Sequence, residues 1–343
     1  MSEERLKNEK PIELISMPKK GDVIHLEQIT EKTWVINGVT MTTVYKMDEH
    51  NCILLDSGHY RDCMEIDRLL EESGLTVRAV LSTHAHHDHF GNCRYFAKKF
   101  GLPVILPLGE AWACSSAETY CLYLGLRSSF RARSGSLAVC IGPVDQTIAF
   151  DQPTITVAGE TFDVLHTRGH TYDNVSFRTP DGVLVVGDLL STGDALKKLR
   201  APYTTVISQD IASKQRIARE PCTACVMAHR GWARPEELPG LAEANIAVYE
   251  SMIDTVRQLI HDPMGIDDII PLFCKARNIY GPTALHGMEM RHVVGAILGY
   301  LLDRHEIRSD TERGLTHFIP CDPDDPAIAN DGLFEGKEMR GRE

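Results

Sequence analysis

The sequence predicts an α/β fold with a small helical unit at its C-terminal end. A strand-then-helix order recurs in two halves of the chain, separated by a break in the pattern at 107–146. Histidine and aspartate residues follow several of the expected strands, at the point where each strand ends. After Pro235 the apolar residues repeat at helical spacing. The chain of 343 residues, 43% of them hydrophobic, is long enough for a large globular domain and a smaller appendage.

The first half begins with a flexible leader at 1–20, followed by short β runs with polar or glycine-containing turns. A helix is expected over 62–72 and ends at Ser73-Gly74. The apolar, β-branched stretch 77–83 predicts a buried strand, and from Asp88 onward the spacing becomes helical. The expected strands of this half are 23–29, 33–36, 40–47, 52–55, 77–83 and 103–106.

The segment 107–146 breaks this rhythm. It is rich in small residues, arginine and cysteine, with Trp112, Tyr120 and Tyr123 interspersed. We interpret it as an inserted helical lid over a site, and a poorly ordered loop is the alternative.

The second half repeats the strand-then-helix order. A helix is expected over 208–220, stopped by Pro221. A long amphipathic pattern at 241–260 and a further helical repeat at 290–301 form the C-terminal unit. The expected strands are 154–157, 161–165, 174–178, 183–186 and 224–228. The predicted parts of the chain are the leader 1–20, a main domain 21–235, a helical unit 236–310 and a polar tail 311–343.

Charge and composition exclude some classes of partner. The formal net charge of −12 and the pI of about 5.7 disfavour broad affinity for nucleic acid or anionic lipid. No apolar stretch approaches the roughly 20 residues that span a bilayer. The start of the chain has no signal-peptide apolar core, so ten cysteines without an export signal predict reduced thiols and a cytoplasmic protein.

The run His84-Ala85-His86-His87-Asp88-His89 is the most informative part of the sequence. It directly follows the expected strand 77–83. In an extended segment His84 and His86 point to the same side, so their imidazoles converge on one point. Asp88 and His89 leave the turn in another direction and could serve a second metal nearby.

Three further residues of metal-binding type lie at strand ends. His170 follows the strand 161–165, Asp188 follows 183–186, and His229 follows 224–228. Loops that directly follow strands are where α/β scaffolds place chemistry, because the sheet holds the base of the loop rigidly.

With these residues the sequence resembles the metallo-β-lactamase-fold hydrolase superfamily, over about residues 22–232. The resemblance implies a four-layered αβ/βα sandwich, here with the small C-terminal helical unit added. The matching motifs are the His-x-His-x-Asp-His run at 84–89, Gly169-His170-Thr171, Gly187-Asp188, His229 and the strand-turn Leu54-Leu55-Asp56-Ser57-Gly58. The family's common Gly-His-Gly around the last histidine is Ala228-His229-Arg230 here.

The resemblance implies a site for two divalent metal ions. One ion is held by His84, His86 and His170, the other by Asp88, His89 and His229, and Asp188 bridges them. Imidazole and carboxylate ligands suit zinc, which is our first expectation, and also iron or manganese. Two such cations lower the pKa of a shared water, and the resulting hydroxide attacks a carbonyl or phosphorus centre. We expect Asp188 and Asp88 to be the catalytic residues, with Asp188 positioning the hydroxide.

Three other residues are candidates for contacts around this site. Asp56 either hydrogen-bonds a ligand imidazole and fixes its orientation or caps a turn. His59 and Tyr172 either reach the substrate or are ordinary surface residues.

Comparison within the superfamily narrows the expected reaction. Flavodiiron members typically have glutamate where this chain has His86, and zinc β-lactamases with this motif usually have cysteine where it has Asp188. Quorum-quenching lactonases typically have tyrosine in place of Ser191, and the acidic charge argues against a tRNA nuclease.

We therefore predict a hydrolase of the thioesterase, lactonase or esterase type that acts on a small molecule, without a nucleic-acid or membrane partner. A phosphodiesterase or nuclease of the same fold is one alternative. A metal-loaded binding or signalling protein is the other. The helical unit could form a pocket wall or mediate a homodimer, because an exposed amphipathic face has to be covered.

Overall fold

The computed structural model describes residues 24–126, 136–229, 231–280, 284–312 and 314–321. The predicted leader 1–20 and the residues from 322 onward lie outside this set. By their internal contacts the residues divide into two units. Unit 1 comprises Met1–Leu199 and Ser208–Ala247, and unit 2 comprises Arg200–Ile207 and Val248–Glu343.

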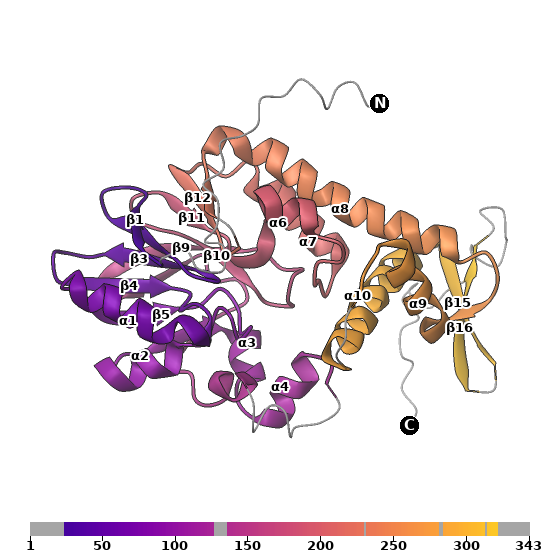
Figure 1. Ribbon diagram of the computed structural model, residues 1–343, viewed down its shortest axis with the longest axis horizontal. Helices are drawn as coiled ribbons and strands as arrows, with labels where there is room; N and C mark the ends of the chain where they lie inside the picture. The colour runs from indigo at the N-terminus through magenta and orange to yellow at the C-terminus, as the bar shows by residue number, and fades with distance from the viewer. Residues whose placement is uncertain (1–23, 127–135, 230, 281–283, 313, 322–343) are drawn as a thin grey trace, which may run out of the picture. The chain divides into compact units, whose positions relative to one another are not determined.

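Unit 1 contains a sheet that has seven strands within the described residues, in the order β1 to β7 along the chain (Figure 1). The strands up to β4 pair antiparallel, and those from β4 to β7 pair parallel. The change of direction coincides with the helices α1 (Cys63–Glu72) and α2 (Cys93–Phe100), because parallel neighbours need a crossover connection. The strands are β1 (Leu26–Gln28), β2 (Thr33–Asn37), β3 (Met41–Lys46), β4 (Asn51–Leu55), β5 (Thr76–Leu81), β6 (Val104–Pro107) and β7 (Gln146–Ile148).

The second sheet of unit 1 has the order β13-β12-β11-β10-β9-β8. Its pairs are antiparallel except β11 with β12, which are parallel and are separated along the chain by η4 (Gly187–Leu189), α6 (Gly193–Lys198) and α7 (Ile207–Ile217). The strands are β8 (Thr154–Val157), β9 (Glu160–His166), β10 (Val175–Arg178), β11 (Val183–Val185), β12 (Ala224–Met227) and β13 (Gly231–Ala233).

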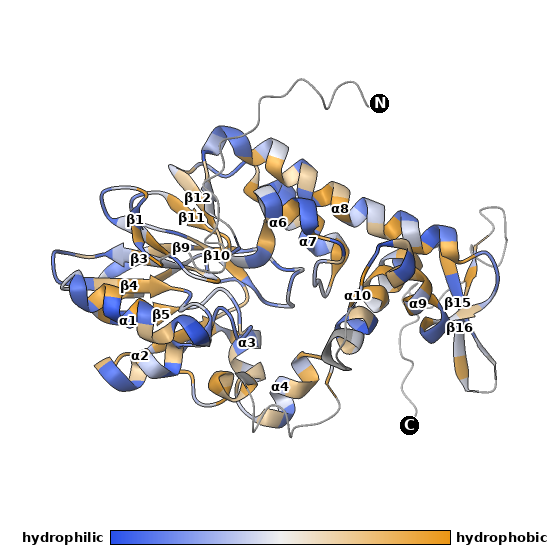
Figure 2. Cartoon of the chain, viewed as in Figure 1, coloured by the Kyte–Doolittle hydropathy of each residue, from blue (hydrophilic) through white to orange (hydrophobic). Residues whose placement is uncertain are grey.

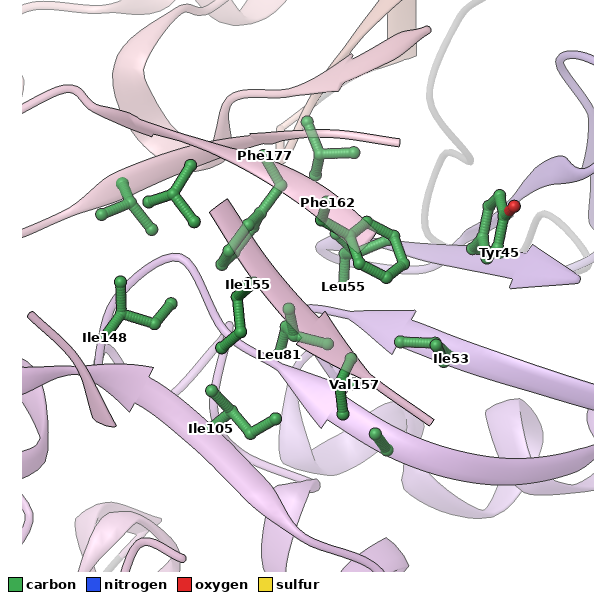
Figure 3. Close-up of a cluster of buried hydrophobic side chains, with 14 residues drawn as sticks. Tyr45, Ile53, Leu55, Leu81, Ile105, Ile148, Ile155, Val157, Phe162 and Phe177 are labelled. Carbon is green, nitrogen blue, oxygen red and sulfur yellow. The ribbon is translucent and has the colours of Figure 1, made fainter. Parts of the chain in front are cut away.

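The two sheets pack face to face around one apolar core. Figure 3 shows side chains of the first sheet, including Ile53 and Leu81, against Ile155, Phe162 and Phe177 of the second. A second cluster joins the other face of the second sheet to Ile217 of α7 and to the start of α8 (Leu238–Leu259). The helix α2 lies against β5 and β6 of the first sheet. These layers confirm the predicted αβ/βα sandwich, and Figure 2 shows apolar strands between helices with hydrophilic outer faces.

The segment predicted as an inserted lid is helical in its described part. It contains α3 (Leu108–Ala113), α4 (Ala117–Tyr123) and η3 (Ser136–Cys140), while 127–135 lies outside the described residues. The helix α4 begins at a capping box, in which Ser116 and Thr119 satisfy each other's backbone N–H groups.

Unit 2 differs from the predicted helical unit in two ways. The predicted tail 311–343 begins inside a hairpin of β15 (Ile307–Glu312) and β16 (Leu315–Pro320), which corrects that boundary. Most side chains of β16 are at least partly exposed, so the strand has no apolar alternation that would reveal it in the sequence. The residues 200–207, predicted in the main domain, belong to unit 2, where Tyr203 stacks on His292 with ring centroids 4.4 Å apart.

The remaining elements of unit 2 are β14 (Met264–Gly265), α9 (Ile266–Ala276) and α10 (Ala284–Asp303). The small sheet has the order β14-β16-β15. Along the chain, the described part of unit 2 has the order helix, strand, helix, helix, strand, strand. Among the helices that the structure describes, none is long and apolar enough to cross a membrane.

Candidate metal centre

All seven predicted ligand residues lie at strand ends of unit 1. His84 and the residues up to His89 follow β5, and His170 follows β9. Asp188 lies in η4 directly after β11, and His229 follows β12. Backbone hydrogen bonds join the two sheets at this edge. The Val175 N–H donates to the Thr83 carbonyl oxygen at 3.1 Å, and the Met41 N–H donates to the Ala228 carbonyl oxygen at 2.8 Å.

Gly187 brings Asp188 close to the histidine run. Its φ is 54°, in the left-handed region, and a side chain at this position would meet Thr83 Oγ1 at 2.7 Å. Glycine therefore permits both the turn after β11 and the close approach to the end of β5.

The first group of potential ligands combines His84, His86, His170 and Asp188, whose ligand atoms all lie within 4.8 Å of one another. His84 Nε2 is 2.9 Å from His86 Nδ1, and His170 Nε2 is 3.1 Å from the same atom. The Oδ2 atom of Asp188 is 3.5 Å from His170 Nε2. Three imidazoles and a carboxylate thus converge on one point.

The second group combines Asp88, His89, His229 and again Asp188. The Oδ1 atom of Asp188 is 3.1 Å from His89 Nε2 and 3.2 Å from His229 Nε2. Asp88 Oδ2 is 3.3 Å from His229 Nε2 and 3.9 Å from His89 Nε2. One oxygen of Asp188 therefore faces each group, as a bridging ligand requires.

Both the spacing and the unsatisfied atoms fit metal ions. Nitrogen or oxygen ligands about 2.0–2.1 Å from a tetrahedral zinc ion lie about 3.3 Å from one another, close to most of the distances above. His89 Nε2 and Asp188 Oδ1 are buried 3.1 Å apart without a well-aligned hydrogen bond, which is costly unless a cation binds both. The residues present fit a pair of divalent cations.

The electrostatics of the groups also favour cations. Burial, reinforced by neighbouring imidazoles, holds the pKa of His84 and of His86 well below the usual range. Both rings are therefore neutral near pH 7 and have lone pairs to donate. The carboxylate of Asp188 raises the pKa of His229 to about 10, so a metal ion and a proton compete for this imidazole.

Asp56 is positioned to orient a ligand imidazole. Its Oδ2 atom accepts a hydrogen bond from His89 Nδ1 at 2.8 Å, which leaves Nε2 for a metal. Its Oδ1 atom accepts from the Thr83 backbone N–H at 2.7 Å and from the Ser82 hydroxyl at 2.9 Å. Asp56 itself has a φ of 59°, which is rare and costly for a residue other than glycine.

Replacing Asp56 by alanine should weaken metal binding at the second group. Loss of the carboxylate that orients a ligand imidazole typically lowers metal affinity about 10- to 100-fold. Zinc titration of the metal-stripped variant against a competing chelator measures this change. Unaltered affinity at both positions would show that Asp56 serves the turn alone.

The other two candidates lie outside both ligand groups. His59 caps η2 (Tyr60–Asp62) by accepting the Arg61 backbone N–H, and its ring lies 5.6 Å from that of His87. Burial lowers the pKa of His59. Tyr172 follows the His170 loop and is 67% exposed, so it is available to a substrate.

Glu110 of α3 is a residue near this centre that sequence reasoning missed. It is buried, and it accepts hydrogen bonds from the Ala85 backbone N–H at 2.9 Å and the Thr171 hydroxyl at 2.6 Å. Burial raises its pKa. A single glutamate at the start of a short helix carries no signal of such a role in the sequence.

The comparison with protein families agrees with this geometry. The family model described as "Metallo-beta-lactamase superfamily" matches residues 36–229, more than half of the chain. The chain belongs to the metallo-beta-lactamase superfamily. The matched range contains the whole of both ligand groups.

Several relatives within the metallo-beta-lactamase superfamily are similar in sequence. A hydroxyacylglutathione hydrolase of Chromohalobacter salexigens is 28% identical over 143 residues, 41% of this chain and 43% of that protein. A hydroxyacylglutathione hydrolase of Haemophilus influenzae is 27% identical over 167 residues, 47% of this chain and 72% of that protein. The chain thus spans less than half the length of the first of these relatives.

Solved structures of the superfamily show the same fold over a larger part of the chain. A beta-lactamase domain protein from Burkholderia ambifaria has a TM-score of 0.65 at 15% identity, covering 89% of this chain and 99% of that one. A metallo-beta-lactamase family protein from Thermus thermophilus has a TM-score of 0.61 at 18% identity, covering 87% of this chain and 99% of that one.

Proposed function

We propose that this protein is a hydrolase that uses two divalent metal ions, zinc in the first instance, to cleave a small-molecule thioester. The observation that carries the proposal is Asp188, whose two carboxylate oxygens face two separate groups of potential ligands. The names of the relatives favour a thioester over the ester and lactone alternatives.

The residues of the two ligand groups have separate roles in the proposed reaction. His84, His86 and His170 would hold one ion, and Asp88, His89 and His229 the other, with Asp188 between them. Such a pair of ions lowers the pKa of a shared water and polarises the carbonyl that is attacked. Asp188 would position the attacking oxygen and take its proton, and Asp88 would act beside it as a ligand of the second ion.

An exposed aromatic side chain in the loop of His170 supports an acyl substrate. Tyr172, two residues after His170, is 67% exposed. The start of α3 meets the His170 loop, because the Gly109 backbone N–H donates to Asp173 Oδ2 at 2.9 Å. Exposed apolar residues near a polar centre are typical of ligand-binding surfaces.

A panel of substrates tests the proposed reaction. Purified protein loaded with zinc should hydrolyse acyl-thioesters with a higher kcat/KM than lactones or bis-p-nitrophenyl phosphate. Cleavage of the phosphodiester alone would instead identify a nuclease-type enzyme. The formal net charge of −12 tells against that alternative, because a strongly acidic protein disfavours binding to phosphate-rich nucleic acid. Absence of turnover on every class would favour a binding protein.

Truncating Tyr172 to alanine should reduce activity on long acyl chains more than on short ones. Loss of one apolar side chain covered by substrate removes about 1.5–3 kcal/mol, which lowers kcat/KM about 10- to 100-fold. Kinetics on a series of thioesters of increasing acyl length measure the difference. Met64→Ala is the control, since Met64 is also exposed but lies on α1, which carries no potential ligand. An equal loss on all lengths would contradict an acyl-binding role.

A further inference from the structure

The inserted helices hold the peptide between two potential ligands from both sides. Ala85 stands between His84 and His86. Its backbone N–H donates to Glu110 Oε2 of α3 at 2.9 Å, and its carbonyl oxygen accepts from the Tyr120 hydroxyl of α4 at 2.8 Å. Both partners are buried. Because the two imidazoles start from either side of this peptide, fixing it fixes the origin of both.

The same glutamate reaches the loop of the third ligand. The Thr171 hydroxyl donates to Glu110 Oε1 at 2.6 Å, and Thr171 directly follows His170. The Tyr123 hydroxyl of α4 donates to Glu110 Oε2 at 2.8 Å, and its ring centroid lies 5.6 Å from that of His86. One carboxylate thus connects the two loops that supply the histidines of the first group.

The arrangement parallels that of Asp56 at the second group. Asp56 joins His89 to the end of β5, and Glu110 joins the His84–His86 loop to the His170 loop. Each is a buried carboxylate that accepts hydrogen bonds from hydroxyl, imidazole or amide groups.

We propose that Glu110 is a positioning residue of the first metal position, holding His84, His86 and His170 in the geometry that binds the ion. This inference rests on the metal centre of the proposed function. It gives α3 and α4 a role in building the metal position, in addition to any role as a lid.

Zinc titration of metal-stripped protein against a competing chelator tests this role without any substrate. His170→Ala and His229→Ala serve as references that remove the first and the second position. Glu110→Ala should lower the zinc affinity of the first position, the one that His170→Ala removes. The expected loss is about 10- to 100-fold. The position that His229→Ala removes should keep its affinity.

A conservative variant separates positioning from packing. In Glu110→Gln the amide oxygen can accept from the Ala85 N–H and the Tyr123 hydroxyl, while the amide N–H donates to the Thr171 oxygen. This variant should therefore recover most of the lost affinity. Asp67→Ala is the matched control, since Asp67 is a buried carboxylate that accepts from Tyr95 and Lys99 and contacts neither ligand loop.

Three outcomes would overturn the inference. They are Glu110→Ala retaining both affinities, Glu110→Ala weakening both positions equally, and Glu110→Gln binding no better than Glu110→Ala. If Glu110→Ala does not fold, Thr171→Val and Tyr123→Phe each remove one bond to Glu110 and should produce a smaller loss confined to the first position. Unchanged first-position affinity in both would contradict the role. A wild-type protein that binds no zinc would contradict the metal centre itself, which is a different failure.

Discussion

Asp188→Asn should abolish hydrolysis of a thioester. Loss of a residue that only orients a metal ligand lowers activity by up to roughly 100-fold, and loss of the bridging carboxylate should lower kcat/KM by more than that. Asparagine keeps the shape of the side chain but replaces one oxygen by an amide nitrogen, which cannot bind a cation. Since one oxygen of Asp188 faces each ligand group, the change removes the bridge whichever way the amide turns. Steady-state kinetics with metal analysis of the same sample measure both effects.

A matched substitution separates this effect from general damage to the fold. Asp67→Asn alters another buried carboxylate of unit 1, on α1, and should leave the metal content and the kinetics close to wild type. The circular dichroism spectrum of Asp188→Asn should remain that of the folded protein. Full activity in Asp188→Asn would rule out a catalytic bridge.

Removal of the metal ions should strongly destabilise unit 1. Without cations, the buried imidazoles and carboxylates of the two groups lose the ions that their spacing fits. A ligand present at about 1,000 times its Kd stabilises a fold by about 4 kcal/mol. For a unit of this size that corresponds to a fall in Tm of about 8–16 °C after chelation.

Scanning calorimetry of the chelator-treated and zinc-restored protein measures this shift. The double variant His170→Ala, His229→Ala provides the control, because it lacks a ligand of each group and should gain little on addition of zinc. An equal gain in Tm for the variant and for wild type would mean that zinc acts elsewhere on the protein.

The sequence identifies the residues of the two candidate ligand groups because its signal is local. The run at 84–89 places four potential ligands within six residues, and His170, Asp188 and His229 each follow a strand that the apolar pattern identifies. Strand ends at one edge of packed sheets lie together, so the convergence follows from the fold. The αβ/βα layers follow from the resemblance and from the same strand order.

The features that the sequence did not reveal depend on contacts between distant residues. Glu110 is 25 positions from Ala85 and 61 from Thr171, and only the folded chain joins them. The hairpin of β15 and β16 has largely polar, exposed faces, so no alternation marks it. Asp56 was predicted only in part. The motif indicates the residue, but only the structure identifies His89 as its hydrogen-bond partner.

X-ray diffraction from crystals of the purified protein, recorded at the absorption edge of the bound metal, tests the central claim most directly. The account predicts two anomalous peaks, one among His84, His86 and His170 and the other among Asp88, His89 and His229, on either side of Asp188. Peaks at neither position, in protein purified without chelator and supplied with zinc, would contradict it.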